Sequence, residues 1–247
     1  MREYKHIEYS DVCPKYNYLD LLLPDGECKA VLVYIHGGGL VVPQPHDNVL
    51  PFMKDLCESG IGVATIEYRG FPRHQYPDFI HDSAAAVAWV KDHIKEYTDC
   101  DKIYVGGSSA GGYLSMMLCF DKKYLGIYGI SPMDIAGFIH DAGQPTAHFN
   151  VLKSRGIDSR RVIVDETSPM YHVGVDSEYP PMIFIVSDND MENRYEQTML
   201  MRSTLKHFGY DDSKIYLEVK NGTHCHYVGK DDGVFSGMIK KFIEKYL

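Results

Sequence analysis

Short apolar runs rich in Val, Ile and Tyr alternate along this chain with segments whose apolar residues recur at helical spacing. The nearly continuous runs predict strands that are buried on both faces of a parallel sheet. These runs are residues 30–35, 61–68, 102–105, 125–130, 182–186 and 214–219. Helical periodicity is found at residues 49–57, 80–88, 113–119 and 235–246. Alternating strands and helices predict a doubly wound α/β sheet.

Two stretches depart from this alternation. Residues 4–9 and 16–23 read as extended segments, and we expect them to form an antiparallel edge of the sheet. Residues 131–181 carry no strong strand signal and are rich in glycine and proline, and a loop region of this length is usually functional. We expect it to form a short cap or lid over the site; the alternative is a surface insertion without a role. The whole chain, residues 1–247, has the length of a single α/β domain.

Charge and composition narrow the classes of partner. The formal net charge is −9, whereas nucleic-acid and anionic-membrane surfaces need basic patches, so neither partner is expected. No apolar run approaches the ~20 residues of a membrane span. The N-terminus also lacks the apolar stretch of a secretory signal, which predicts a cytoplasmic protein.

Six scattered cysteines without a Cys-x-x-Cys pair predict no disulfide framework. These features leave the oligomeric state open.

Residues 107–111, Gly-Ser-Ser-Ala-Gly, carry the strongest chemical signal in the chain. They follow a predicted strand and precede a predicted helix, which is the setting of the nucleophile elbow of a serine hydrolase. In such a turn the serine is strained, and glycines prevent collisions across the turn. Ser109 has glycines two residues before and two residues after it, whereas Ser108 does not, so Ser109 is the predicted nucleophile. Taken alone, the motif could instead be a simple strand-to-helix turn or a phosphate-binding turn.

A second glycine run, His36-Gly37-Gly38-Gly39, directly follows the predicted strand 30–35. Its exposed backbone N–H groups can hold the oxyanion of a tetrahedral intermediate, together with the N–H of Ala110, the residue after the nucleophile. A phosphate-binding loop is the alternative. It is weakly supported, because neither a Gly-Lys-Ser/Thr nor a Gly-x-Gly-x-x-Gly pattern is present.

The nucleophile requires a base, and the base requires an orienting acid. In this type of fold the order along the chain is serine, acid, histidine, with the acid and the histidine after the last two core strands. Asp188 and Asp190 follow the first of these predicted strands, and His224 and His226 follow the second. The expected residue types therefore occur in the expected order.

Of these pairs we favour Asp190 and His224. Asp190 lies beyond the strand end, where a loop can direct it towards a histidine, and His224 comes soon after its strand. Asp188 and His226 are the alternatives. No metal is expected at the two histidines, because no further Cys or His cluster occurs at ligand spacing.

Together these motifs resemble the α/β-hydrolases, in particular the esterase and lipase branch related to hormone-sensitive lipase. The resemblance covers roughly residues 28–245, and its motifs occur in one order. They are His36-Gly37-Gly38-Gly39, Glu67-Tyr68-Arg69, Gly107-Ser108-Ser109-Ala110-Gly111-Gly112, Ser168-Pro169-Met170, Pro180-Pro181, Asp190 and Gly222-Thr223-His224.

The resemblance implies an α/β-hydrolase fold, with a mostly parallel eight-stranded doubly wound sheet, helices on both faces and a short cap insertion. It also implies hydrolysis of carboxylic esters through an acyl-enzyme, without a metal or an organic cofactor. The residues carried over are Ser109, Asp190 and His224 as the catalytic triad and Gly38, Gly39 and Ala110 as donors of the oxyanion hole.

The branch commonly has an acidic residue at the position of Ser108 and a large aromatic residue at that of Leu40. With its short length, the chain resembles instead the compact esterases that remove acetyl or feruloyl groups from plant polysaccharide fragments. The expected partner is therefore a small-molecule ester, with a short acyl chain or an acylated sugar. Residues considered for its pocket are Leu40, Met133, Phe138, Ile139, Phe149, Met170 and Tyr171. Alternatives are an amidase or peptidase of the same fold, similar to kynurenine formamidase, and a catalytically silent binding protein.

Overall fold

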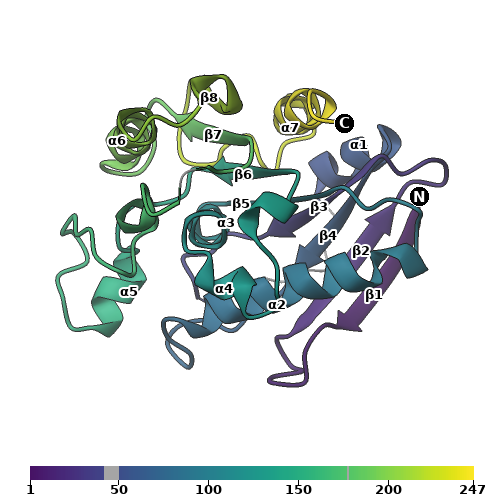
Figure 1. The fold of residues 1–247 in the computed structure, drawn as a ribbon, viewed down its shortest axis with the longest axis horizontal. Coiled ribbons are helices and arrows are strands. Elements are labelled where there is room, and N and C mark those ends of the chain that lie inside the picture. Colours follow the sequence, from purple (N-terminus) through teal and green to yellow (C-terminus); the bar gives the residue numbers. More distant parts are fainter. Residues whose placement is uncertain (42–49, 177) are drawn as a thin grey trace.

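A computed structural model describes residues 1–41, 50–176 and 178–247, and its strands form an eight-stranded sheet (Figure 1). The strands are β1 (Arg2–Glu8), β2 (Tyr18–Leu23), β3 (Ala30–Ile35), β4 (Ile61–Ile66), β5 (Ile103–Ser108), β6 (Gly137–Asp141), β7 (Met182–Ser187) and β8 (Ile215–Lys220). Their order across the sheet is β1-β2-β4-β3-β5-β6-β7-β8. The pairs β1–β2 and β2–β4 are antiparallel, and all later neighbours are parallel.

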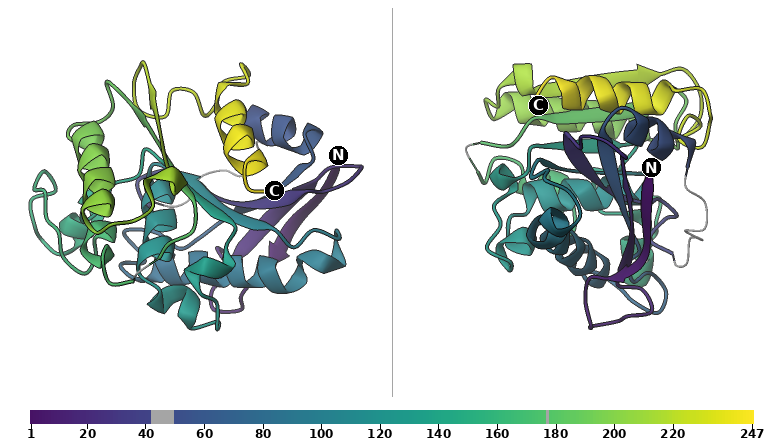
Figure 2. Two further views of the ribbon diagram at one scale, coloured as in Figure 1. Left: turned by 45° about the horizontal axis from the view of Figure 1, so that its top comes forward. Right: turned by 90° about the vertical axis from the view of Figure 1, so that its right-hand side faces the viewer.

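Helices cover both faces of this sheet. They are α1 (Pro51–Glu58), α2 (Asp78–His93), α3 (Ala110–Phe120), α4 (Lys123–Gly126), α5 (Phe149–Ser154), α6 (Arg194–His207) and α7 (Val234–Glu244). Helices α1 and α7 pack on one face, and α2, α3 and α6 pack on the other (Figure 2). In the described ranges, no helix has the length and apolar character needed to cross a bilayer.

The burial of the strands explains why they form the centre of the molecule. Every residue of β3, β4, β5 and β7 is buried, as expected for parallel strands covered on both faces. Helix α3 is buried along its whole length, whereas α1 and α7 each have one apolar face. The fold predicted from the alternation of strands and helices is confirmed, including the antiparallel edge formed by β1 and β2.

One predicted strand is wrong. Residues 125–130 form the end of α4 and a turn, because Gly129 has φ 70° and reverses the chain there. The sixth strand is instead β6, which lies inside residues 131–181, the stretch without a strong strand signal in the sequence. Its last two residues, His140 and Asp141, are polar but buried, so the sequence does not show a continuous apolar run there. Val49, the first position of the first predicted helix, lies outside the described residues.

The parallel strands all end at one edge of the sheet, where the loops that carry function in such folds are found. The glycine run follows β3 there, the Gly-Ser-Ser-Ala-Gly motif follows β5, and the loops with Asp190 and His224 follow β7 and β8. The topology therefore brings four separate motifs to one place.

Candidate active site

Ser109 occupies a tight turn between β5 and α3, with φ 57° and ψ −113°. This conformation is strained for a residue with a side chain. A Cβ on Gly107 would lie 2.4 Å from the carbonyl oxygen of Ile35, and one on Gly111 would lie 1.8 Å from the same atom. Both glycines are therefore required by the packing of the turn against β3.

Three polar side chains from three loops meet at this turn. His224 Nε2 lies 2.8 Å from Ser109 Oγ, and His224 Nδ1 lies 2.5 Å from Asp190 Oδ1. The Asp190 side chain is completely buried, whereas the His224 side chain is 24% exposed, so the imidazole is accessible from the surface. A hydroxyl, an imidazole and a carboxylate thus form a continuous series of hydrogen bonds, the arrangement that activates a serine as a nucleophile.

Asp190 is held in its ionised form. Burial acts to raise its pKa, but the hydrogen bond to His224 and the charge of that side chain lower it. The backbone N–H groups of Met191 and Ser187 also donate to the carboxylate, and the net effect is a lowered pKa. An ionised carboxylate beside Nδ1 favours a proton on that nitrogen, which leaves Nε2 to accept the proton of Ser109.

The alternatives to Asp190 and His224 have other contacts. Asp188 accepts hydrogen bonds from the Gly222 N–H and the Asn221 amide, so it braces the loop that follows β8. His226 Nδ1 lies 2.8 Å from the carbonyl oxygen of Thr223. Neither contacts Ser109. Over the described ranges, no group of three or more His, Cys, Asp or Glu side chains has an arrangement suited to a metal ion.

The glycine run after β3 lies against the serine turn. A Cβ on Gly37 would come within 3.3 Å of Ser109 Cβ, and Gly38 and Gly39 have φ values of 102° and 66°. The Asn150 side-chain amide donates to the Gly39 carbonyl at 2.5 Å and so fixes the direction of that peptide. Ala110 is the first residue of α3, where backbone N–H groups have no partner within the helix.

The chain is similar in sequence and in fold to known esterases. The BD-FAE family model matches residues 19–127, which include both glycine motifs. The probable carboxylic ester hydrolase LipM of Mycobacterium tuberculosis is 30% identical over 217 residues, covering 76% of this chain and 49% of LipM. A truncated carbohydrate esterase from gut microbiota matches with a TM-score of 0.80 at 18% identity, over 100% of this chain and 96% of that one. The thermophilic esterase Est2 of Thermogutta terrifontis, with propionate bound, matches with a TM-score of 0.73 at 18% identity, over 96% and 92%.

The chain has the α/β-hydrolase fold. It spans about half the length of LipM.

A cavity of about 590 Å³ lies between Phe149, a neighbour of the glycine run, and the loop after β7. Phe149 lines it, and the ring of Phe149 would lie 3.4 Å from a Cβ on Gly39. On the other side it is lined by Met191, the neighbour of Asp190 in sequence. The cavity also has a polar lining, which includes Arg160, Arg161, Glu192 and Arg194. Its position makes it the candidate site for the variable part of a substrate.

Four other residues predicted for an apolar pocket lie in the core of the protein. Leu40, which directly follows the glycine run, is fully buried in the core with φ 63°. Phe138 and Ile139 are buried within β6, and Met170 is buried in the same core cluster as α3. Apolar character alone does not distinguish a core position from a pocket position, which is why these predictions fail.

Met133 and Tyr171 are exposed but remote from Ser109. Met133 lies in the turn before β6, which is the opposite edge of the sheet from the serine turn. Tyr171 precedes His172, whose Nε2 lies 3.4 Å from Asp121, just beyond the C-terminal end of α3. Because Ser109 is at the N-terminal end of α3, neither prediction places a residue at the site.

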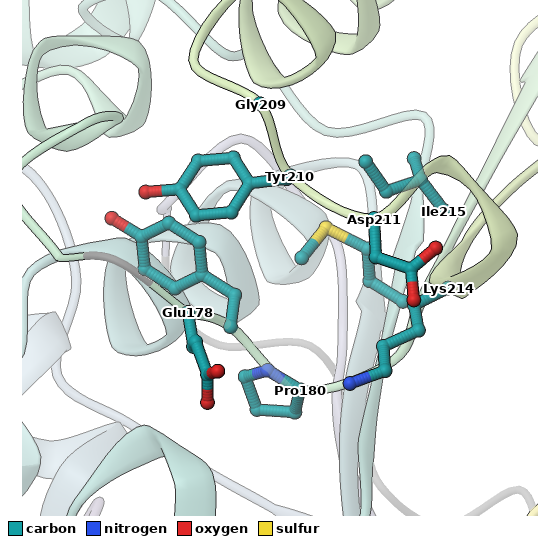
Figure 3. Close-up of a pocket in the computed structure, with 9 residues that line it drawn as sticks. Glu178, Pro180, Gly209, Tyr210, Asp211, Lys214 and Ile215 are labelled. Atoms are coloured by element: carbon teal, nitrogen blue, oxygen red, sulfur yellow. The ribbon is translucent and has the colours of Figure 1, made fainter.

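Another cavity, of about 230 Å³, lies between the segment that enters β7 and the connection from α6 to β8 (Figure 3). Pro180, Tyr210 and Lys214 are among the residues that line it. This cavity lies at the amino ends of β7 and β8, whereas the serine turn lies at the carboxyl ends of the strands. The two are therefore at opposite edges of the sheet.

Polar residues that the sequence analysis missed also converge on the site. Asn150 orients the glycine run, and Asp141 accepts hydrogen bonds behind the serine turn from Ser108 and Tyr227. The dense polar stretch between His140 and Asn150, much of it buried, is the only local signal that could have pointed to them.

Proposed function

We propose that this chain is a serine carboxylesterase, with Ser109 as the nucleophile, His224 as the general base and Asp190 as the orienting acid. The observation that carries the proposal is the unbroken series of hydrogen bonds through these three side chains, at 2.8 Å and 2.5 Å. The names of LipM and of the structurally similar esterases support ester hydrolysis as the reaction class.

In the first half of the reaction His224 Nε2 takes the proton of Ser109 Oγ as this oxygen attacks the ester carbonyl carbon. The imidazolium that forms is stabilised by the carboxylate of Asp190. The carbon–oxygen bond to the alcohol then breaks, and His224 gives its proton to the departing alcohol. Water, activated by the same histidine, hydrolyses the acyl-enzyme and restores Ser109.

The negative oxygen of each tetrahedral intermediate needs donors. We assign this role to the backbone N–H groups of Gly38, Gly39 and Ala110, because the glycine run contacts the serine turn and α3 begins directly beneath it. The positive end of the helix dipole favours the same charge. Loss of one such donor typically lowers kcat about 10²–10³-fold.

For the substrate we propose esters with a short acyl chain or an acylated sugar. The propionate bound to Est2 and the carbohydrate esterase of similar fold support this class. The cavity beside Gly39 and Asp190 has both an aromatic ring, Phe149, and several polar side chains, which suits a sugar or an aryl group better than a long alkyl chain.

We further propose that the chain is one catalytic domain, with the cap within residues 131–181 but without β6. Residues 137–141 are a strand of the sheet, so they are not part of a lid. The cytoplasmic location stays a prediction.

The test is a fluorophosphonate probe combined with an ester panel. Wild-type protein should be labelled at Ser109 and should hydrolyse p-nitrophenyl acetate and butyrate faster than the decanoate. Ser109→Ala should lose labelling and turnover. Ser59→Ala is the matched control, since the Ser59 hydroxyl donates to the Asp55 carbonyl at the end of α1, far from the site. Turnover by Ser109→Ala at the wild-type rate would refute the proposal. Acetylated and feruloylated xylo-oligosaccharides then separate sugar esters from simple ones.

A further inference from the structure

Asp141 is a fully buried carboxylate directly behind the serine turn. It is the last residue of β6, and in the sheet it pairs with Ser108, the last residue of β5. Ser108 Oγ donates to Asp141 Oδ2 at 2.5 Å, and the Ser109 N–H donates to the Asp141 carbonyl oxygen at 2.8 Å. Asp141 therefore holds the serine turn through both its side chain and its backbone.

The second carboxylate oxygen holds the histidine loop. Tyr227 Oη donates to Asp141 Oδ1 at 2.6 Å, and Tyr227 is buried three residues after His224. Cys225, between them, has φ 49° and places its sulfur 3.9 Å from Asp141 Oδ2. One carboxylate thus connects the two segments that carry Ser109 and His224, which are 115 residues apart in sequence.

The hydroxyl groups around Asp141 all donate hydrogen bonds in its direction. Tyr34 Oη donates to Ser108 Oγ at 2.8 Å, Ser108 donates onward to Asp141, and Tyr227 donates from the other side. An ionised carboxylate, which only accepts, satisfies all of these donors. Within the described ranges Asp141 forms no ion pair with Lys or Arg, and a buried charge without such a partner is costly. A cost of this kind is characteristic of a functional site.

Few other charges face this buried space. They are His224 and Asp190, and Arg194, whose guanidinium donates to the carbonyl of Ala142. The remaining titratable neighbours are Tyr34, Cys225 and Tyr227, and burial raises the pKa of each, so they stay neutral. The Asp141 charge therefore acts mainly on His224.

We propose that Asp141 is a positioning residue of the hydrolytic site. Its carboxylate holds the serine turn and the histidine loop at a fixed spacing, and its charge favours the protonated form of His224 that arises during the reaction. This inference rests on the proposed function, since it assigns Asp141 a role in the same reaction.

The test compares Asp141→Asn and Tyr227→Phe with the matched control Tyr104→Phe. Tyr104 is also buried, but its hydroxyl lies 3.4 Å from the Ile243 carbonyl, on the α7 side of the sheet. For p-nitrophenyl acetate, Asp141→Asn should lower kcat about tenfold or more with KM within about twofold. Tyr227→Phe should lower kcat about threefold, and Tyr104→Phe should leave it unchanged.

The pH profile distinguishes positioning from mere structural support. Asp141→Asn removes a negative charge that acts on the site, so the acid limb of the kcat/KM profile should move to lower pH in this variant. A folded Asp141→Asn protein with wild-type kcat and an unmoved acid limb would overturn the inference. If Asp141→Asn does not fold, Tyr227→Phe decides: activity equal to that of Tyr104→Phe overturns the inference.

The proposed function is judged separately. If the fluorophosphonate does not label wild-type Ser109, the esterase assignment fails, and the role of Asp141 fails with it. If Ser109 is labelled while the Asp141 and Tyr227 variants behave like Tyr104→Phe, only the role of Asp141 fails.

Discussion

The α-carbon of Gly111 faces the backbone of Ile35 so closely that a Cβ there would lie 1.8 Å from the Ile35 carbonyl oxygen. Since that oxygen belongs to β3 at the centre of the sheet, it cannot move away without disturbing the strand. Packing against β3 therefore requires a glycine at position 111. The close approach of Gly111 to Ile35 determines where the first turn of α3 meets the sheet.

Gly111→Ala should therefore destabilise the protein strongly, by about 4 kcal/mol or more in the free energy of unfolding measured with urea. Gly237→Ala is the matched control, because Gly237 lies within α7 and a Cβ there meets nothing within 4 Å. The control should gain about 0.5–1 kcal/mol from its better helix propensity. Equal stability of the two variants would contradict the packing argument.

The two aspartates after β7 should differ greatly in their effect on turnover. Asp190→Asn removes the charge beside His224 Nδ1 and permits the wrong imidazole tautomer, so kcat should fall about 10⁴-fold. Asp188→Asn changes only the hydrogen bonds that hold the loop after β8, so it should lower kcat less than about tenfold. Steady-state kinetics with p-nitrophenyl butyrate compares them, and a larger loss in Asp188→Asn would reverse the assignment of the acid.

The glycine run should depend on Asn150. Asn150→Ala removes the amide that holds the Gly39 carbonyl, so the oxyanion donors become less well oriented and kcat should fall about tenfold, with a smaller change in KM. Ser154→Ala, in the same helix, loses only a hydrogen bond to the Val151 carbonyl and should keep wild-type kcat. Similar kcat values for the two variants would show that Asn150 does not orient the run.

Much of the fold could be read from the sequence, because its strands are continuous apolar runs. The predicted strand 30–35 coincides with β3, and the order of serine, acid and histidine follows from the order of the strands that precede them. Strand β6 could not be recognised in this way. His140 is buried and bonded to Ser115, and Asp141 is buried among hydroxyls, so polar residues interrupt the apolar signal.

The surroundings of the site could not be derived from local patterns. Asp141 meets Tyr34 through Ser108 and also meets Tyr227, and these residues are brought together only by the sheet. Most of the pocket predictions fail for a related reason, Phe149 being the exception. Leu40 and Phe149 are both apolar, yet one is in the core and the other lines the cavity, and only tertiary structure distinguishes them.

The burial of Asp141 should also leave a signature in the pH dependence of stability. Burial raises the pKa of Asp141 to about 6, from an ordinary value of 3.8, while hydrogen bonds from Ser108 and Tyr227 limit the rise. Below about pH 3 the carboxyl is protonated in both the folded and the unfolded state. Above about pH 7 it is ionised in both, and the folded state then holds a buried charge. The contribution of Asp141 to stability therefore falls as pH rises between these values, by about 3 kcal/mol in total.

Asp141→Asn does not titrate at this position, so its unfolding free energy relative to that of the wild type should increase by about 3 kcal/mol from pH 3 to pH 7. Urea unfolding of both proteins at several pH values measures this difference, in which the contributions of groups that do not interact with Asp141 cancel. The same variant should be slower in ester hydrolysis, because the charge that destabilises the fold at neutral pH is the one that favours protonated His224. A difference in unfolding free energy that does not change with pH would mean that Asp141 titrates near its ordinary pKa, and the burial argument would then be wrong.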